Sequence, residues 1–193
     1  GDCLLHIDHT EFPLPLLFVS EYATARLLLR WCIEPSCMIG HSLGEYVAAC
    51  SSGVFTLEDA LKLIVKRGAL MNKMPRGAML SVLIGKEALQ PLLEENSDVC
   101  LASVNSSERC VVSGPERSIK AFQKQATEQG FENRIIRTSH AFHSHMMDDM
   151  LEEFEQCVRS VDIHPGRIPF ISNLSGEKVR NEEISQARYW VDH

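Results

Sequence analysis

Ser42 has the clearest chemical context of any side chain in this sequence, because a glycine stands two residues before it and another two residues after it. The stretch reads Gly40-His41-Ser42-Leu43-Gly44, with the apolar run 37–39 before it and the helix-forming run 45–50 after it. A G-x-S-x-G sequence between a strand and a helix is typical of a nucleophile elbow, where glycines let the backbone close tightly. We therefore expect Ser42 to project at a helix N-terminus, where the Leu43 N–H can bind an oxyanion.

A serine nucleophile needs a base, because its hydroxyl is almost never ionised near neutral pH. Three of the eight histidines stand together at His140, His143 and His145, and this cluster is the predicted source of the base. Metal binding is the alternative use of the cluster, but no cysteine or acidic residue stands at zinc-like spacing from it, so we expect no metal site. Other histidines are expected to be loop residues without function: His6, His9 and His164.

Arg67 falls on the apolar face of a predicted helix, which it shares with Ala60, Ile64 and Met71. A buried guanidinium without a partner is too costly, so Arg67 must meet an anion. That anion is either a structural Asp or Glu, or a substrate carboxylate held in a two-point grip. The pattern alone favours the structural ion pair.

Composition excludes several classes of protein. With 26 acidic against 19 basic residues and no basic block, nothing indicates nucleic-acid binding, and no apolar run is long enough to span a bilayer. The seven cysteines are scattered, and several lie in apolar contexts that predict buried, reduced thiols in a cytoplasmic protein: Cys32, Cys50, Cys100 and Cys110. The start has neither an initiator Met nor a signal peptide, so we expect a segment of something larger.

The remaining pattern predicts an α/β fold with one inserted unit. Core elements are expected as a helix at 15–32, a strand at 37–39, and helices at 45–50 and 56–74. A β-α-β-β-α-β order follows, with strands at 78–84, 99–104, 109–113 and 131–138 and helices at 87–95 and 115–129. A loop at 138–144, a helix at 145–161 and a strand at 168–172 close the chain. We predict an α/β-hydrolase-like layered core from 1–76 and 139–193, truncated at both ends, and an inserted ferredoxin-like subdomain at 77–138.

The sequence resembles the acyltransferase domains of modular polyketide synthases and the malonyl-CoA:acyl carrier protein transacylases. The resemblance runs over nearly the whole chain, through the elbow to Glu45 and through these further stretches: Lys66-Arg67-Gly68, Gly77-Ala78-Met79, Ala102-Ser103-Val104-Asn105, Val112-Ser113-Gly114-Pro115, His140-Ala141-Phe142-His143-Ser144, Ile171-Ser172-Asn173 and Tyr189-Trp190-Val191. It implies that Ser42 accepts the acyl group, that His143 is the base, and that Arg67 binds the free carboxylate of a malonyl-type unit.

The resemblance also implies a mechanism, a substrate and partners. Ser42 would attack the thioester of malonyl-CoA and pass the acyl group to the phosphopantetheine thiol of an acyl carrier protein, with no bound cofactor. A ketosynthase and its linker would be neighbours in a megasynthase. A backbone carbonyl, matched here to His193, would orient the base in place of an acidic residue. The further substrate-binding residues would be His41, Met71, His140 and Phe142.

Specificity follows from the same motif. The resemblance implies that His140-Ala141-Phe142-His143 selects malonyl over methylmalonyl units, since Phe142 leaves little room for an α-methyl, and Leu43 agrees with this selection. One methyl group discriminates by only about 1–3 kcal/mol.

The ends depart from the family pattern. No Gly-Gln-Gly-x-Gln loop, whose glutamine would supply a second oxyanion donor, precedes Pro15, and no Pro-Val segment follows Val191. Two other functions stay open: a serine acyl-thioesterase or editing acyl hydrolase, and a non-catalytic docking module of a megasynthase. Arg67 and the inserted unit favour the transferase over the hydrolase, and the Ser-His-Arg set argues against the module.

Overall fold

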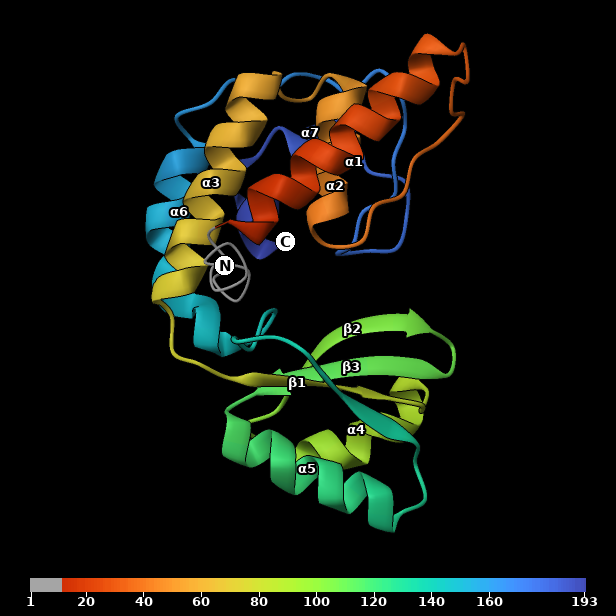
Figure 1. Cartoon of the computed structure of the whole chain (residues 1–193), viewed down its shortest axis with the longest axis vertical. Coiled ribbons are helices and arrows are strands. Elements are labelled where there is room, and N and C mark those ends of the chain that lie inside the picture. Colours follow the sequence, from red (N-terminus) through yellow and green to blue (C-terminus); the bar gives the residue numbers. More distant parts are fainter. Residues whose placement is uncertain (1–11) are drawn as a thin grey trace, which may run out of the picture. The chain divides into compact units, whose positions relative to one another are not determined.

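The computed structural model describes residues 12–193, so His6 and His9 lie outside the described residues (Figure 1). The chain divides into two compact units. The first is formed by residues up to Leu70 together with Leu151–His193, and the second by Met71–Met150. These bounds differ from the sequence-based division at 76 and 139. The sequence-based limits, 1–76 with 139–193 and 77–138, stay a prediction.

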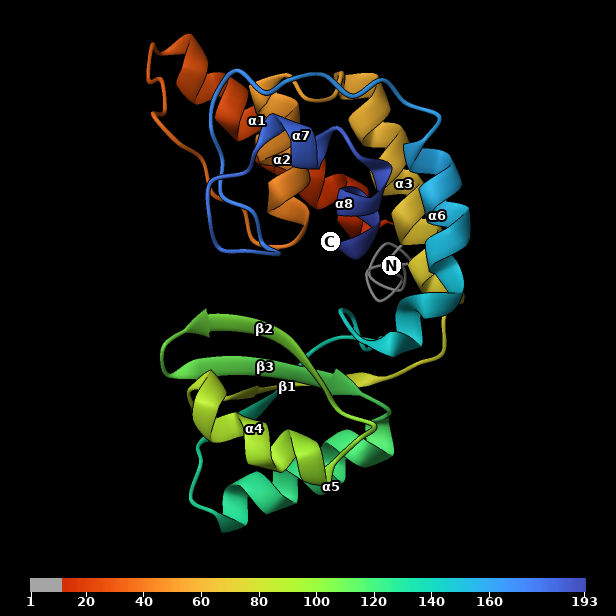
Figure 2. The ribbon, with the colours of Figure 1, turned by 180° about the vertical axis from the view of Figure 1, so that it is seen from behind.

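The first unit is mainly helical. Its helices are α1 (Pro13–Arg30), α2 (Leu43–Ser52), most of α3 (Leu57–Lys73), α6 (Leu151–Val158), α7 (Asn181–Ile184) and α8 (Ala187–Asp192). Its core includes the rings of Tyr46, Phe55 and Trp190, with ring centroids 4.7 to 6.5 Å apart. Figure 2 shows α8 among the other helices of this unit. The C-terminal segment is thereby part of the core that surrounds the elbow.

Two helix ends are set by local capping. Helix α2 ends at Gly53, whose φ of 88° is left-handed and suits glycine. The Thr56 hydroxyl accepts a hydrogen bond from the Asp59 N–H at 3.1 Å, which caps the start of α3. Local sequence signals therefore set where these helices begin and end.

Two predicted strands are present only as a short parallel contact. Met38 pairs with Phe170, with hydrogen bonds from Met38 N to Pro169 O (2.9 Å) and from Ile171 N to Met38 O (3.0 Å). The prediction of full strands at 37–39 and 168–172 was therefore wrong in extent. Pro169 has no N–H to extend the ladder, and Ile39 is 78% exposed.

Helix α1 matches the predicted helix, but most of its apolar side chains are not covered. Phe18 is buried, whereas several others are exposed within the described part of the chain: Leu17, Val19, Leu27, Leu28 and the adjacent Trp31. Helix α2 is the helix that α1 contacts most. The exposed side is therefore the one that faces away from α2.

The second unit is an antiparallel sheet with two helices on one face (Figures 1 and 2). Its elements are β1 (Ala78–Val82), α4 (Lys86–Glu95), β2 (Cys100–Ser106), β3 (Arg109–Gly114), α5 (Glu116–Glu128), β4 (Asn133–Ile136) and the 3-10 helix η2 (His145–Met150). The strand order is β2-β3-β1-β4, with every neighbouring pair antiparallel. Alternate strand residues such as Leu80 and Val112 pack against Ile119 and Phe122 of α5.

The helix predicted at 145–161 begins differently. Its first six residues, His145–Met150, form a 3-10 helix, and the α-helix starts only at Leu151. Ser144 closes the preceding turn through local hydrogen bonds, and a tighter 3-10 turn is a common way for a helix to begin. The change falls at the boundary between the two units.

The cysteine prediction holds for two of its four residues. Cys50 and Cys110 are buried, Cys100 is half-buried and Cys32 is exposed, and the six described cysteines are all free thiols. Cys32 follows the end of α1 with a φ of 61°, outside the helix that would have buried it. Sequence context alone did not reveal that turn.

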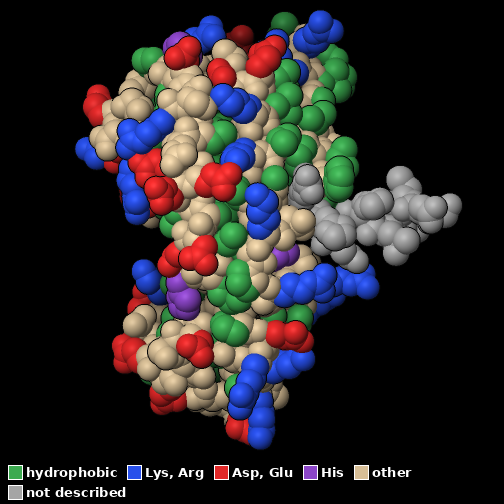
Figure 3. All heavy atoms as spheres, turned by 90° about the vertical axis from the view of Figure 1, so that its left-hand side faces the viewer, with side chains coloured by type: hydrophobic (Ala, Val, Ile, Leu, Met, Phe, Trp, Pro, Cys, Tyr) green, Lys and Arg blue, Asp and Glu red, His purple; other side chains and the backbone are tan. Residues whose placement is uncertain are grey.

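The surface carries both signs of charge. Figure 3 shows Lys and Arg side chains interspersed with Asp and Glu side chains on the face in view, as the composition predicts. Among residues 12–193 we find no helix with the length and apolar character needed to cross a membrane.

Candidate active site

Ser42 sits on a strained turn directly before α2. Its φ of 50° and ψ of −113° lie in a region that non-glycine residues rarely adopt. A Cβ at Gly40 would lie 2.0 Å from the carbonyl carbon of Gly44, so glycine is required at position 40. At Gly44 a Cβ would meet only the Glu21 carboxylate, at 3.6 Å, so tight closure does not explain the second glycine.

The backbone after Ser42 offers an oxyanion donor. Leu43 is the first residue of α2, so its N–H lies outside the intrahelical hydrogen-bond ladder. The Ser42 side chain makes no capping hydrogen bond to the helix. This is the local arrangement that the elbow motif predicts.

Asn173 holds the elbow from a distant part of the chain. Its Oδ1 accepts a hydrogen bond from the Ser42 N–H at 2.7 Å, and its Nδ2 donates to the Gly40 carbonyl at 2.6 Å. The Asn173 N–H in turn donates to Glu45 Oε2 at 2.7 Å. The sequence showed Asn173 only as part of a family motif, without a role.

Glu45 is a fully buried carboxylate that collects several donors. Besides the Asn173 N–H, it accepts a hydrogen bond from the Tyr189 hydroxyl, whose pKa is raised by burial and by this bond. The Nε2 atom of His193 lies 3.2 Å from Glu45 Oε2, bent away from ideal hydrogen-bond geometry. Its position directly after the elbow is the only sequence signal that could have drawn attention to Glu45.

Arg67 is buried, as the helical pattern predicts, with 6% of its surface exposed. Its guanidinium carbon lies 5.2 Å from the centroid of the Tyr46 ring and 5.9 Å from that of Phe154. Among residues 12–193 no Asp or Glu forms a direct ion pair with it. The structural ion pair favoured by the pattern alone is therefore not formed with the described residues.

His193 is the main polar partner of Arg67. Arg67 Nη1 lies 3.3 Å from His193 Nδ1, and Nη2 donates to the His193 carbonyl at 3.3 Å. A guanidinium can only donate, so Nδ1 must be the acceptor and Nε2 must carry the proton toward Glu45. Burial lowers the pKa of His193, which agrees with a neutral ring. The carbonyl that was expected to orient His143 thus has Arg67 as a donor.

In the second unit, His143 also has a strained backbone, with a φ of 57°. The turn is closed by a hydrogen bond from the Ser144 hydroxyl to the Ala141 carbonyl (2.7 Å) and by one from the Met146 N–H to Ser144 Oγ (3.2 Å). Ser42 and His143 are two of the three non-glycine residues with positive φ in the described part of the chain. Such strain is common at functional sites.

The neighbouring histidines have other environments. His140 is buried, its Nδ1 lies 2.7 Å from Ser139 Oγ, and burial lowers its pKa. His145 is exposed and its Nδ1 lies 2.9 Å from Cys100 Sγ.

The other predicted substrate-binding residues are placed as follows. Phe142 is half-buried, with its ring centroid 6.0 Å from that of His140 in the second unit. Met71 is buried on α3, and His41 is exposed directly before Ser42. Their roles toward a substrate stay predictions.

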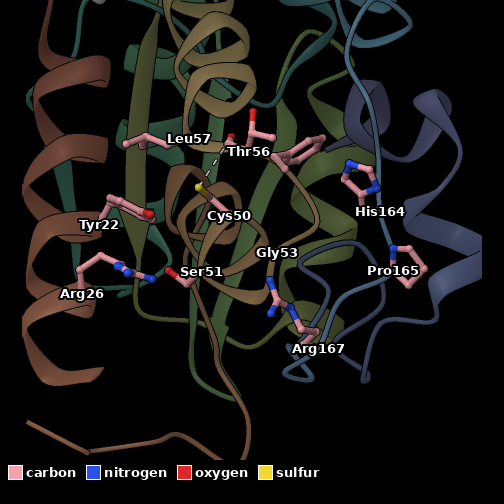
Figure 4. A pocket seen from close by; sticks show the side chains of 11 residues that line it. Tyr22, Arg26, Cys50, Ser51, Gly53, Thr56, Leu57, His164, Pro165 and Arg167 are labelled. Carbon is pink, nitrogen blue, oxygen red and sulfur yellow. Dashed lines mark hydrogen bonds between the residues drawn. The ribbon is translucent and has the colours of Figure 1, made fainter. Parts of the chain in front are cut away.

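A cavity of about 560 Å³ lies in the first unit, between α1 and the C-terminal end of α2 (Figure 4). Its lining includes Arg26, Ser51, His164 and Arg167, and none of the predicted site residues. Within residues 12–193 no group of three or more His, Cys, Asp or Glu side chains could hold a metal ion.

Comparisons with known proteins place the chain in a family. The family model described as "Acyl transferase domain" matches residues 5–193. The chain is 40% identical over 97% of its length to the Spectinabilin polyketide synthase system protein NorB of Streptomyces orinoci, of which it covers 9%.

Solved structures give the same result. The acyl transferase domain of ZmaA is 43% identical with a TM-score of 0.90, over 97% of this chain and 43% of that one. The malonyl CoA-acyl carrier protein transacylase from Burkholderia pseudomallei is 28% identical with a TM-score of 0.90, over 100% of this chain and 67% of that one. The resemblance stated from the motifs is confirmed, and the chain belongs to the acyl transferase domain family.

Proposed function

We propose that this chain loads a malonyl unit from malonyl-CoA onto Ser42 and passes it to the phosphopantetheine thiol of an acyl carrier protein. The observation that carries the proposal is Arg67, a buried cation with no direct ion pair to a described acidic residue. A carboxylate on the acyl unit would supply the missing anion in a two-point grip. Acetyl units lack that group.

The residues of the chain supply each step of a two-stage transfer. His143 takes the proton of Ser42 as the serine oxygen bonds to the thioester carbon, and the Leu43 N–H stabilises the oxyanion. The C–S bond then breaks, and His143 returns the proton to the leaving thiolate of CoA. In the second stage His143 deprotonates the phosphopantetheine thiol, whose sulfur bonds to the acyl carbon, and as the bond from that carbon to Ser42 Oγ breaks, His143 returns the proton to Ser42.

The proposed selection against methylmalonyl units rests on Phe142. Its ring is half-buried beside buried His140, so its freedom to move away from an added methyl group is restricted. Leu43 is buried and places an apolar side chain directly after the nucleophile.

The proposed architecture is a hydrolase-like layered core with a ferredoxin-like subdomain. The β-α-β-β-α-β order and the strand order β2-β3-β1-β4 of the second unit support the latter. The chain spans 9% of NorB, a polyketide synthase system protein, which supports a place in a multidomain synthase with a ketosynthase neighbour and a carrier partner. A cytoplasmic location is part of the same proposal.

The test is to incubate the full-length protein separately with malonyl-, methylmalonyl- and acetyl-CoA, and to measure the intact mass. We expect a malonyl adduct on Ser42 that moves to an added holo carrier protein. An adduct that is released to water instead would indicate an acyl hydrolase. No adduct from any of the three would indicate a docking module.

A further inference from the structure

We propose that Glu45 is a positioning residue that holds the Ser42 elbow and the Arg67 guanidinium in one fixed arrangement. The inference rests on the roles proposed above for Ser42 and Arg67. It concerns how the nucleophile and the carboxylate-binding group are kept in place relative to each other, within the first unit. Neither the motif nor the comparisons assign this role.

Glu45 is fully buried near the start of α2. A carboxylate with no exposed surface is very costly unless donors surround it. The donors that face it, the Asn173 N–H, the Tyr189 hydroxyl and the His193 Nε2–H, all come from the last 21 residues of the chain, 173–193. The carboxylate therefore fastens the start of α2 to the C-terminal segment.

One arm of this arrangement reaches the nucleophile. Glu45 fixes the backbone of Asn173, and the Asn173 amide bonds the backbone that leads into Ser42, at the Gly40 carbonyl and at the Ser42 N–H. A φ/ψ pair as unfavourable as that of Ser42 costs about 1–3 kcal/mol and persists only when its surroundings hold it. The Asn173 amide is the group placed to do so.

The other arm reaches the guanidinium. The His193 ring lies between the Glu45 carboxylate and Arg67, with its Nε2 3.2 Å from Glu45 and its Nδ1 3.3 Å from Arg67. The carboxylate favours the tautomer that leaves Nδ1 free to accept from Arg67. Glu45 thus orients Arg67 through the His193 ring and balances its charge without a direct ion pair.

Because one carboxylate supports both arms, its loss should affect two measurable quantities together. A loosened elbow lowers the maximal rate of acylation for every substrate. A loosened guanidinium raises the concentration of malonyl-CoA needed for half-saturation, and does so less for acetyl-CoA, which brings no carboxylate. Separate substitutions at Asn173 and at His193 can test the link to Ser42 and the link to Arg67 one at a time.

The experiment compares Glu45→Gln, Asn173→Ala and His193→Ala in the full-length protein. Three quantities are measured for each: labelling of Ser42 by a fluorophosphonate, acylation kinetics with malonyl- and acetyl-CoA, and the melting temperature. Asn173→Ala should slow labelling and both acylations by about 10-fold, with half-saturating concentrations unchanged. His193→Ala should raise half-saturation for malonyl-CoA about 10-fold more than for acetyl-CoA. Glu45→Gln should show both effects.

Two further variants separate positioning from a general loss of stability. Asn173→Asp keeps the acceptor for the Ser42 N–H but loses the donor to Gly40, so its labelling rate should lie between wild type and alanine. Asn96→Ala removes two side-chain hydrogen bonds in the second unit and should lower only the melting temperature.

The proposal is overturned if Glu45→Gln lowers the melting temperature while labelling and acylation rates per folded molecule match wild type. It is also overturned if His193→Ala, like Asn173→Ala, changes the kinetics with malonyl-CoA and with acetyl-CoA equally. Failure of the proposed function looks different, because the wild-type protein would then form no malonyl adduct. Fluorophosphonate labelling would in that case still support or overturn the elbow arm.

Discussion

The two units hold their strained residues by different means. In the first, Ser42 has a φ of 50° and is held by Asn173, 131 residues further along the chain. In the second, His143 has a φ of 57°, and the bonds that close its turn span two or three residues. The amide that holds Ser42 is therefore distant in sequence, whereas the bonds that close the turn at His143 are local. Long-range contacts reach that loop just before it, where Ser139 and His140 meet Gly77 and Arg76. Substitutions should act differently on the two.

The largest effect is expected from Ser42→Ala. It should abolish the acyl-enzyme, because the covalent intermediate has no other attachment point beside the Leu43 N–H. Intact-protein mass spectrometry after incubation with malonyl-CoA measures this directly. The same acyl adduct on the variant would remove Ser42 from the mechanism.

His143→Ala is the corresponding change in the second unit. Loss of a general base should cut acylation by roughly 10²–10⁴-fold. His140→Ala and His145→Ala are the controls, since His140 is buried against Ser139 and His145 contacts Cys100. Pre-steady-state acylation rates distinguish them, and equal losses at His143 and His145 would show that the base is misassigned.

Arg67→Ala should weaken malonyl transfer by roughly 10²-fold, because a charge-assisted two-point contact is lost. Acetyl transfer should be spared or improved, since the cavity left beside Met71 suits a neutral acyl group. Arg67→Lys should fall between wild type and alanine for malonyl alone, because lysine lacks the planar fork. Competition between malonyl- and acetyl-CoA measures the ratio, and Arg159→Ala serves as an exposed control. If Arg67→Ala lowered malonyl and acetyl transfer equally and also destabilised the protein, the role of Arg67 would be structural.

The element order could be predicted from sequence because each signal is local. Gly53 and Thr56 mark their helix ends by their own chemistry, and the second unit follows alternating apolar patterns. The strands around Met38 could not be predicted in extent, because their pairing depends on Phe170 and on the missing N–H of Pro169.

The site residues also fall into those that local sequence patterns revealed and those that only the structure revealed. Ser42, His143 and Arg67 were found from a contiguous motif, a cluster and a helical face. The roles of Glu45 and Asn173 were missed because their hydrogen bonds join residues 128 to 133 positions apart. A single sequence carries no signal of such pairs. Residue types alone also suggested that Gly44 is needed for closure, which the open space at its Cβ position contradicts.

Gly40→Ala and Gly44→Ala test whether the elbow excludes a Cβ at position 40 but tolerates one at position 44. A methyl at position 40 would meet the Gly44 backbone at 2.0 Å, and we expect a loss of about 3 kcal/mol or more in unfolding free energy. Alanine at position 44 meets only a side chain at 3.6 Å and should be neutral or stabilising by up to about 1 kcal/mol, since it lies in α2. Ser144→Ala, which removes the local bonds at His143, should cost about 1–2 kcal/mol. Chemical denaturation gives all three values, and a neutral Gly40→Ala would refute the crowded elbow.

The smallest effect concerns pH, and it uses one buried histidine from each unit. Burial lowers the pKa of both His193 and His140 below the usual value. As the pH falls, these two histidines therefore become protonated in the unfolded chain before they do so in the folded chain. Stability should therefore be complete above a pH of about 6.5 and should decline as the pH falls below it, by no more than ~1.4 kcal/mol per pH unit for each histidine.

The two tryptophans make the units separable in this measurement. Trp31 and Trp190 both lie in the first unit, so their fluorescence reports its unfolding, while hydrogen exchange of β1 and β3 reports the second. His193→Gln should flatten the decline between pH 7.5 and 5.5 seen by fluorescence and leave that of the strands unchanged. His140→Gln should do the reverse. If either variant flattened both responses equally, the two units would unfold as one, and the contrast between a long-range and a local design would not extend to their stability.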